Sequence, residues 1–296
     1  MRFVRLKQIF MKQLRMIVLV VLLLQGCVAS KKTPPIWKTL PEIPVMPSAD
    51  EIGFLPVNDI NMYYAIFNKQ GKEPVILLHG GFGNADWWGY EVPLLSKTHQ
   101  VIILDNRGHG RSTMSDQAFS YQLMASDVLQ LMDQLHLQKV SIVGWSDGGI
   151  IGLVLAMKHP DRIDKLFTYG TNFKKSGEKS EPMDSATGAK FMTKVRADYH
   201  KLSPTPDDFL KFRAALGKMY STEPNLIPAE IKTIKAPTVI AAGQYEQFYK
   251  REHFEELAGL IPNAICVILP NVSHGGPIQN PAQFHKAVMK LLDGHH

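Results

Sequence analysis

Residues 139–150 read KVSIVGWSDGGI, and the chain continues with the apolar stretch IGLVLAM. A β-branched apolar run, a GxSxG turn and a second apolar run predict a strand, a sharp turn and a helix. Such a turn holds the serine hydroxyl above the sheet edge, and the flanking glycines let strand and helix approach closely. Ser146 is therefore the candidate nucleophile, with an ordinary glycine turn as the alternative interpretation.

The composition is that of a globular protein with one large domain. The 296 residues are 45% hydrophobic and can bury a full core. The formal charge is +6, but five basic residues lie among the first fifteen, and without them 28 basic residues face 27 acidic ones. The charge therefore gives no reason to expect nucleic-acid binding.

The N-terminus has the pattern of an export signal. The basic residues precede nine apolar residues, Met16–Leu24, which are too few to span a bilayer about 30 Å thick. The next residues lead to Cys27 and resemble a bacterial lipobox. We expect residues 1–26 to be a lipoprotein-type signal peptide and Cys27 to be lipidated, with an uncleaved signal anchor as the alternative. Val28, where an aspartate would resemble an inner-membrane retention signal, favours the bacterial outer membrane, facing the periplasm.

Residues 27–50 contain five prolines and are expected to form an extended tether. The second cysteine, Cys266, lies in a predicted buried strand. With Cys27 acylated it has no partner, so we expect no disulfide, and the sequence has no metal-ligand spacing. No metal and no organic cofactor is expected.

Short apolar runs alternate with helical patterns through most of the chain. This alternation predicts an α/β fold with a mostly parallel sheet and helices on both faces. We expect its core to comprise residues 51–170 and 234–296. Strands are expected at 52–57, 60–68, 75–78, 101–104, 139–143, 163–169, 237–242 and 264–269, and helices at 85–97, 121–135, 148–158, 251–260 and 281–292.

The alternation stops between residues 171 and 233, where helical patterns appear at 189–200 and 207–219. A strandless stretch of this length is unusual for a plain loop. We therefore expect 171–233 to be a helical lid inserted into the core, over the site.

A serine hydroxyl needs a base within hydrogen-bond reach, and that base needs an orienting carboxylate. His274 follows the last predicted strand, at the carboxyl end where α/β sheets place their sites. A lone loop histidine is more often a surface or structural residue. Here the chain order of serine, acid and histidine favours a base.

The sequence resembles the α/β-hydrolase superfamily over nearly all of residues 52–292. The motifs that carry the resemblance are HGG at 79–81, DNRGHGRS at 105–112, the turn at Ser146 and NVSH at 271–274. The resemblance implies the α/β-hydrolase fold and assigns Glu246 as the triad acid, where aspartate is typical. The glutamates of the following helix, Glu252, Glu255 and Glu256, are expected to face solvent.

The resemblance also implies an oxyanion hole built from backbone N–H groups. We expect the N–H of Asp147, at a helix start, and that of Gly81, with Phe82 as the second choice. His79 and His109 are expected to be structural, and Asp105 is expected to pair with Arg107. Trp87, Trp88 and Trp145 could line a pocket, although buried aromatic residues more often belong to the core.

These features predict a serine hydrolase, most similar to carboxylesterases, that cleaves a small-molecule ester or related acyl compound through an acyl-enzyme. Within the same fold, cleavage of a C–C bond, an amide or a thioester, or perhydrolysis, stays open. Epoxide opening and dehalogenation are disfavoured because relatives with those activities carry an aspartate where this chain has Ser146. From another class, a membrane-tethered binding protein that has lost turnover stays open. The sequence gives no indication of the oligomeric state.

Overall fold

The computed structural model describes residues 3, 11, 13, 33–180 and 185–294, and an eight-stranded sheet organises this part of the chain. The chain divides into two units, Met1–Pro34 and Pro35–His296, and the fold described below is that of the second. Among the described residues, no helix has both the length and the apolar character needed to cross a membrane. Cys27 and the predicted signal peptide cleavage site lie outside the described residues.

The sheet has the order β1-β2-β4-β3-β5-β6-β7-β8. β1 pairs with β2, and β2 with β4, in antiparallel fashion, while all later neighbours are parallel. The expected mostly parallel sheet is confirmed. The strands are β1 (Glu51–Val57), β2 (Ile60–Phe67), β3 (Lys72–Leu78), β4 (His99–Leu104), β5 (Val140–Trp145), β6 (Ile163–Tyr169), β7 (Thr238–Gly243) and β8 (Ile265–Leu269).

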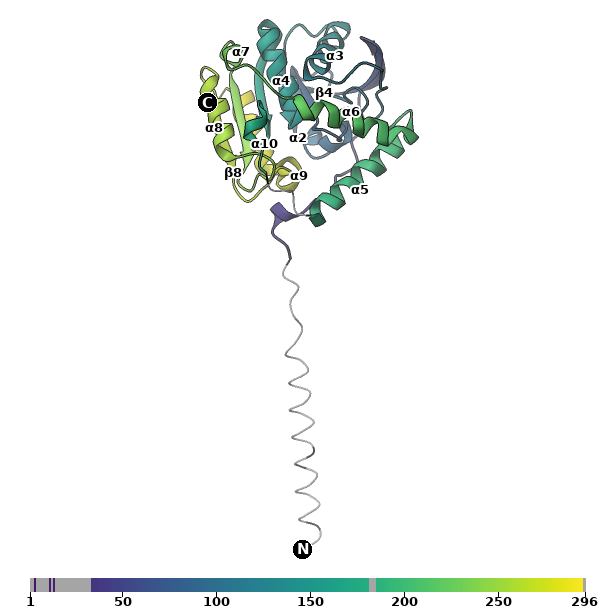
Figure 1. The fold of residues 1–296 in the computed structure, drawn as a ribbon, viewed down its shortest axis with the longest axis vertical. Coiled ribbons are helices and arrows are strands. Elements are labelled where there is room, and N and C mark those ends of the chain that lie inside the picture. The colour runs from purple at the N-terminus through teal and green to yellow at the C-terminus, as the bar shows by residue number, and fades with distance from the viewer. Residues whose placement is uncertain (1–2, 4–10, 12, 14–32, 181–184, 295–296) are drawn as a thin grey trace. The chain divides into compact units, whose positions relative to one another are not determined.

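Helices cover the sheet on both faces (Figure 1). They are α2 (Val92–Leu95), α3 (Tyr121–Gln134), α4 (Asp147–Lys158), α5 (Ser185–Leu202), α6 (Phe209–Thr222), α7 (Pro228–Ile231), α8 (Arg251–Leu260), α9 (Gly276–Gln279) and α10 (Pro281–Leu292). Short 3₁₀ turns are η2 (Ile36–Lys38), η3 (Ala85–Trp88), η4 (Pro160–Arg162), η5 (Lys175–Gly177) and η6 (Pro206–Asp208).

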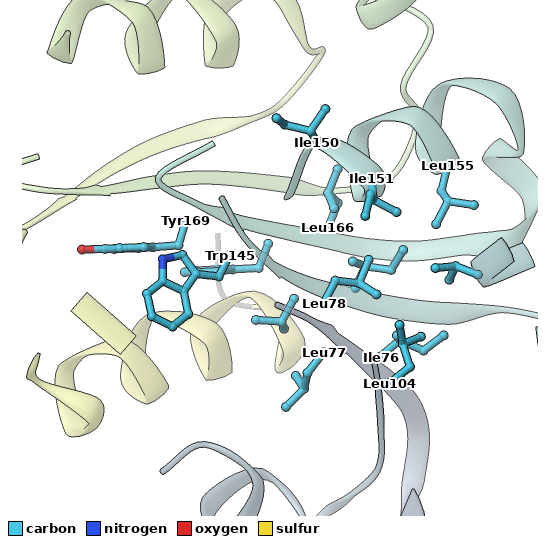
Figure 2. Packing of buried hydrophobic residues seen from close by; sticks show 14 of the residues in the cluster. Ile76, Leu77, Leu78, Leu104, Trp145, Ile150, Ile151, Leu155, Leu166 and Tyr169 are labelled. Carbon is cyan, nitrogen blue, oxygen red and sulfur yellow. The ribbon is translucent and has the colours of Figure 1, made fainter. Parts of the chain in front are cut away.

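Helix α4 is the centre of the core. It packs against α3 and against strands β3, β5 and β6, and every residue from Asp147 to Met157 is buried. A helix that is apolar all round is typical of such an enclosed position. Figure 2 shows Ile151 and Leu155 of α4 meeting one face of the strands, while Trp145 and Tyr169 point to the opposite face. There Tyr169 packs on Phe284 of α10.

Two predicted elements differ in detail. The helix expected at 85–97 is split into η3 and α2, and Pro93 in the first turn of α2 has no N–H with which a helix could continue from η3. The strand around Cys266 is only partly buried, because β8 is an edge strand of the sheet. Cys266 itself is a free thiol.

Between β6 and β7 the chain forms α5 and α6, which contact each other. α5 contains the helical stretch expected at 189–200, and the one expected at 207–219 begins in η6 and continues in α6. The helices of this segment are therefore confirmed, and its role as a lid stays a prediction.

Residues 35–50 belong to the same unit as the sheet. Leu40, Ile43, Met46 and Ala49 are partly buried against the core. This part of the predicted tether thus lies along the domain surface.

The close approach of β3 and α4 gives a test of the fold. A Cβ atom on Gly148 would lie 2.0 Å from the Leu78 carbonyl oxygen, and both groups belong to buried backbone that cannot move cheaply. We expect Gly148→Ala to lower the free energy of unfolding by about 3 kcal/mol. Urea unfolding followed by circular dichroism measures this value.

Gly217→Ala in α6 is the matched control, since no atom of the described chain would lie within 4 Å of the new Cβ. Its helix position predicts stabilisation of about 0.5–1 kcal/mol. Equal changes in the two variants would contradict the assigned role of the close approach.

Candidate active site

Ser146 lies at the junction of β5 and α4 in a strained backbone conformation, with φ 54° and ψ −117°. Its N–H donates to the carbonyl of Tyr169 (2.8 Å), and its carbonyl accepts from the N–H of Gly149 (2.9 Å). Non-glycine residues hold such a conformation only where the surrounding packing enforces it. Ser146 lines the cavity described below.

His274 and Glu246 form a close pair. The carboxylate oxygens of Glu246 lie 2.9 and 3.0 Å from Nδ1 of His274. Glu246 follows β7, His274 follows β8, and these adjacent parallel strands bring the two loops to one edge of the sheet. Glu246 is only 6% exposed, so water screens the pair weakly.

Gly170 is a site residue that the sequence analysis missed. It follows β6, has a φ of +60°, and faces the pair formed by His274 and Glu246. A Cβ atom there would lie 2.8 Å from Nδ1 of His274 and 3.3 Å from Oε2 of Glu246. Only glycine both adopts this conformation and leaves space for the imidazole.

The hydroxyl of Ser146 faces the phenol of Tyr249 and interacts with it, which lowers the pKa of the phenol slightly against larger opposing effects. Within the described part of the chain, no hydrogen bond joins Ser146 to His274. The pKa of Tyr249 is raised well above 10, first by burial and then by the charges of Asp147, Glu246 and Glu178. Tyr249 is therefore a neutral phenol at physiological pH, able to exchange a hydrogen bond with the serine.

The two candidate oxyanion donors lie close to the serine. The N–H of Asp147 begins α4, where the helix dipole favours an anion. Gly81 lies in the loop after β3, and its neighbour Gly80 approaches the Cβ of Ser146. The N–H of Phe82, the second choice, donates to Nε2 of His109 (3.3 Å) and is thus already engaged.

The carboxyl group of Asp147 is a second polar centre that the sequence analysis did not identify. It accepts hydrogen bonds from the phenols of Tyr220 (2.6 Å) and Tyr121 (3.0 Å). Burial raises its pKa, against the lowering effect of the two phenols and of His274. Tyr220 comes from α6 and Tyr121 from α3, so this carboxyl connects the serine turn to the β6–β7 helices. No sequence motif marks these tyrosines.

The prediction that Asp105 pairs with Arg107 is wrong. Arg107 instead forms a two-point ion pair with Asp127 of α3, at 2.6 and 2.7 Å, and both side chains are fully buried. Asp105 accepts from the N–H of Ala85 and pairs with Arg111. Both residues are structural, as expected, but the fold gives each a different partner.

His79 and His109 are confirmed as buried structural residues. Nε2 of His79 accepts from the N–H of Asn106 (3.1 Å), and Nδ1 of His109 lies 3.0 Å from the carbonyl of Arg107. Burial lowers the pKa of His79. Burial, assisted by His79, lowers the pKa of His109 to about 3. Both imidazoles are neutral at physiological pH.

The serine, the histidine and both candidate donors line a cavity of about 550 Å³. Among the predicted aromatic residues, Trp87 and Trp145 line it, whereas Trp88 is buried elsewhere in the core. Its apolar lining includes Leu40, Trp87, Trp145, Phe191 and Met192, and its polar lining includes Tyr121, Asp147, Lys175, Tyr220 and Glu223. Among the described residues, no group of three or more His, Cys, Asp or Glu side chains could hold a metal ion.

Known proteins resemble this chain in both sequence and structure. A family model of the alpha/beta hydrolase fold matches residues 73–202. A Caulobacter sp. (strain K31) protein named as a carbamate hydrolase, RutD, is 28% identical over 246 residues, covering 75% of this chain and 91% of that protein. The serine hydrolase BPHL of Mus musculus is 26% identical, covering 80% and 84%.

Among solved structures, the enol-lactonase from Burkholderia xenovorans LB400 superposes with a TM-score of 0.65 at 24% identity. The match covers 81% of this chain and 99% of that one. The chain has the α/β-hydrolase fold.

The buried neutral His109 predicts a pH-dependent stability. An unfolded histidine binds a proton below pH 6.5, whereas folded His109 does so only near pH 3. As pH falls from 6.5 to 3, His109 therefore lowers the free energy of unfolding by up to about 1.4 kcal/mol per pH unit. His109→Gln, which keeps an acceptor for Phe82, should reduce the slope by that amount.

Urea unfolding of the two proteins at pH 7.5, 5.5 and 4.5 measures the slope. The free energies of unfolding at pH 7.5 give the effect of the substitution itself, because His109 is neutral there in both the folded and the unfolded protein. Equal slopes in the two proteins would contradict the assignment of His109 as a buried neutral residue.

Proposed function

From the α/β-hydrolase fold and the geometry around Ser146, we propose that this protein is a serine hydrolase that cleaves carboxylic esters or related acyl compounds. The observation that carries the proposal is the contact of His274 with the buried Glu246 beside a strained serine that faces a cavity. A base oriented by a carboxylate is what a serine hydroxyl needs to become nucleophilic. The names of the relatives, a serine hydrolase and a carbamate hydrolase, agree with acyl transfer.

In the proposed mechanism, the Nδ1–H of His274 donates a hydrogen bond to Glu246, which keeps Nε2 unprotonated and free to act as the base. The Ser146 hydroxyl turns from Tyr249 toward Nε2 by rotation about its Cα–Cβ bond. It then attacks the substrate carbonyl as its proton passes to His274, which later protonates the leaving group. A water molecule then gives a proton to His274 and attacks the acyl-enzyme, and the carboxylic acid is released as Ser146 regains its proton.

Negative charge develops on the carbonyl oxygen during attack. The N–H groups of Asp147 and Gly81 are the proposed donors, because they lie beside the serine while the N–H of Phe82 is engaged by His109. Donors fixed in place before the reaction lower the barrier because they need no reorganisation. The β6–β7 helices, which contribute Tyr220 and Phe191 to the cavity, are the proposed lid over this site.

We further propose that the protein is lipid-anchored through Cys27 in the bacterial cell envelope, at the outer membrane facing the periplasm. Support comes from the sequence alone: a basic segment, a short apolar run and a lipobox-like sequence. An acylated cysteine would hold the domain at a membrane surface.

Reaction with a fluorophosphonate probe tests the catalytic proposal. We expect wild-type protein to be labelled at Ser146, as located by peptide mass spectrometry, and Ser146→Ala to remain unlabelled. Glu246→Gln should slow labelling by about 10²-fold to 10⁴-fold, because His274 loses the carboxylate that orients it. Glu252→Gln, an exposed residue of α8, is the matched control and should label at the wild-type rate.

Absence of labelling in folded wild-type protein would overturn the proposal and favour a binding protein without turnover. Labelling that is equally fast in Glu246→Gln would remove Glu246 from the triad. After positive labelling, p-nitrophenyl esters, thioesters, anilides and diketones identify the bond that is cleaved.

Metabolic labelling with an alkyne palmitate tests the anchor. Expression in a Gram-negative host should give a labelled, membrane-associated protein, and Cys27→Ser should abolish the label. Cys266→Ser is the control and should keep it, because Cys266 lies in the folded domain. Label retained in Cys27→Ser would contradict lipidation at that residue.

A further inference from the structure

Part of the predicted tether lies against the cavity. We call residues 36–46 the strap. It starts with η2 and continues as extended chain across the domain. Figure 1 shows η2 beside α9 and the beginning of α5, and η2 is in contact with α9. The strap is therefore part of the folded domain.

Hydrogen bonds hold the strap against the C-terminal end of α9. The side-chain amide of Gln279 donates to the carbonyls of Thr39 (2.9 Å) and Trp37 (3.4 Å). Gln279 also accepts from the N–H of Ser273 (2.8 Å), the residue before His274. One buried amide thus connects the strap backbone to the loop that carries the candidate base.

A second attachment uses aromatic packing. The indole of Trp37 stacks on the ring of Tyr245 with centroids 4.3 Å apart and an interplanar angle of 18°. Tyr245 precedes Glu246, so this contact lies beside the candidate acid. Farther along, the hydroxyl of Tyr90 donates to the carbonyl of Glu42 (3.0 Å). These separate contacts give the strap one defined path.

The strap also reaches the proposed lid. The hydroxyl of Thr187, at the beginning of α5, donates to the carbonyl of Lys38 at 3.5 Å. Phe191 and Met192, one turn later on α5, line the cavity together with Leu40. The strap and α5 therefore bound the same part of the cavity.

Leu40 is the apolar side chain that the strap presents to the cavity. It is partly buried, and Thr39 beside it also belongs to the lining. The neighbouring apolar lining comes from Trp87, Phe191 and Met192, of which Trp87 and Phe191 pack edge to face at 5.7 Å. An apolar wall of this kind accommodates an apolar group of a substrate.

We propose that the strap completes the substrate cavity and that Leu40 determines the size of the apolar acyl group that it accepts. This inference rests on the proposed function, because it names the substrate class of the same site. A larger side chain at position 40 shortens the apolar part of the cavity, and a smaller one extends it. Adding or removing one methylene against such a wall changes kcat/KM by about 10-fold to 200-fold.

The test compares p-nitrophenyl acetate, butyrate and octanoate on the full-length protein. Leu40→Trp should lower kcat/KM for the octanoate by at least about 10-fold relative to the acetate. Leu40→Ala should change the octanoate-to-acetate ratio in the opposite direction, because it lengthens the apolar part of the cavity. Val45→Trp is the matched control, since Val45 is 95% exposed on the same strap and does not line the cavity.

Fluorophosphonate labelling of Ser146 in each variant separates the possible failures. If the variants label and hydrolyse acetate but keep the wild-type octanoate-to-acetate ratio, the inference is overturned while the proposed function stands. If wild-type Ser146 does not label, the proposed function fails and the inference fails with it. A ratio altered equally by Val45→Trp would also overturn the role of Leu40.

Discussion

The close contact of the backbone of β5 with the first turn of α4 is the constraint on which the site depends. A Cβ atom at Gly144 of β5 would lie 2.5 Å from the backbone of Gly148 in α4, and one at Gly148 would lie 2.0 Å from the Leu78 carbonyl oxygen of β3, so α4 approaches both strands this closely only with glycine there. This closure forces Ser146 to a φ of 54°. The strain is sustained because α4 is buried along its length between strands and helices, where it cannot move to relieve it.

Buried polar groups then fix the loops around that turn. Asp105 accepts from the N–H groups of Ala85 and Arg111, and it thereby connects the loop after β4 to η3. Arg107 is held by Asp127 in a fully buried ion pair. Removing a partner of Asp105, or one member of the Arg107–Asp127 ion pair, would leave a charge in a poorly solvated position, which is strongly unfavourable. These contacts fix the position of η3, whose Trp87 lines the cavity, relative to the loop after β4.

The cavity combines two kinds of surface. Trp87, Phe191 and Leu40 belong to its apolar lining, while Tyr121, Tyr220 and the Asp147 carboxyl belong to its polar lining. The tyrosines keep their protons because burial and the nearby carboxyl raise their pKa well above 10. The β6–β7 segment contributes to both, through Phe191 of α5 and Tyr220 of α6. A change in its position would therefore alter the apolar and the polar lining together.

The sequence by itself determined the fold class, the strand and helix order and the candidates Ser146, His274 and Glu246. Periodicity marks each element, the GxSxG turn marks Ser146, and the end of the last parallel strand marks His274, whereas Glu246 came from the resemblance to the α/β-hydrolase superfamily. Only the tertiary structure decided which groups meet across long separations in the chain. Arg107 pairs with Asp127 rather than with Asp105, Tyr249 reaches Ser146, and Gln279 holds the strap against the cavity. Such contacts depend on how helices and loops pack after the sheet has formed, and no local pattern records that packing.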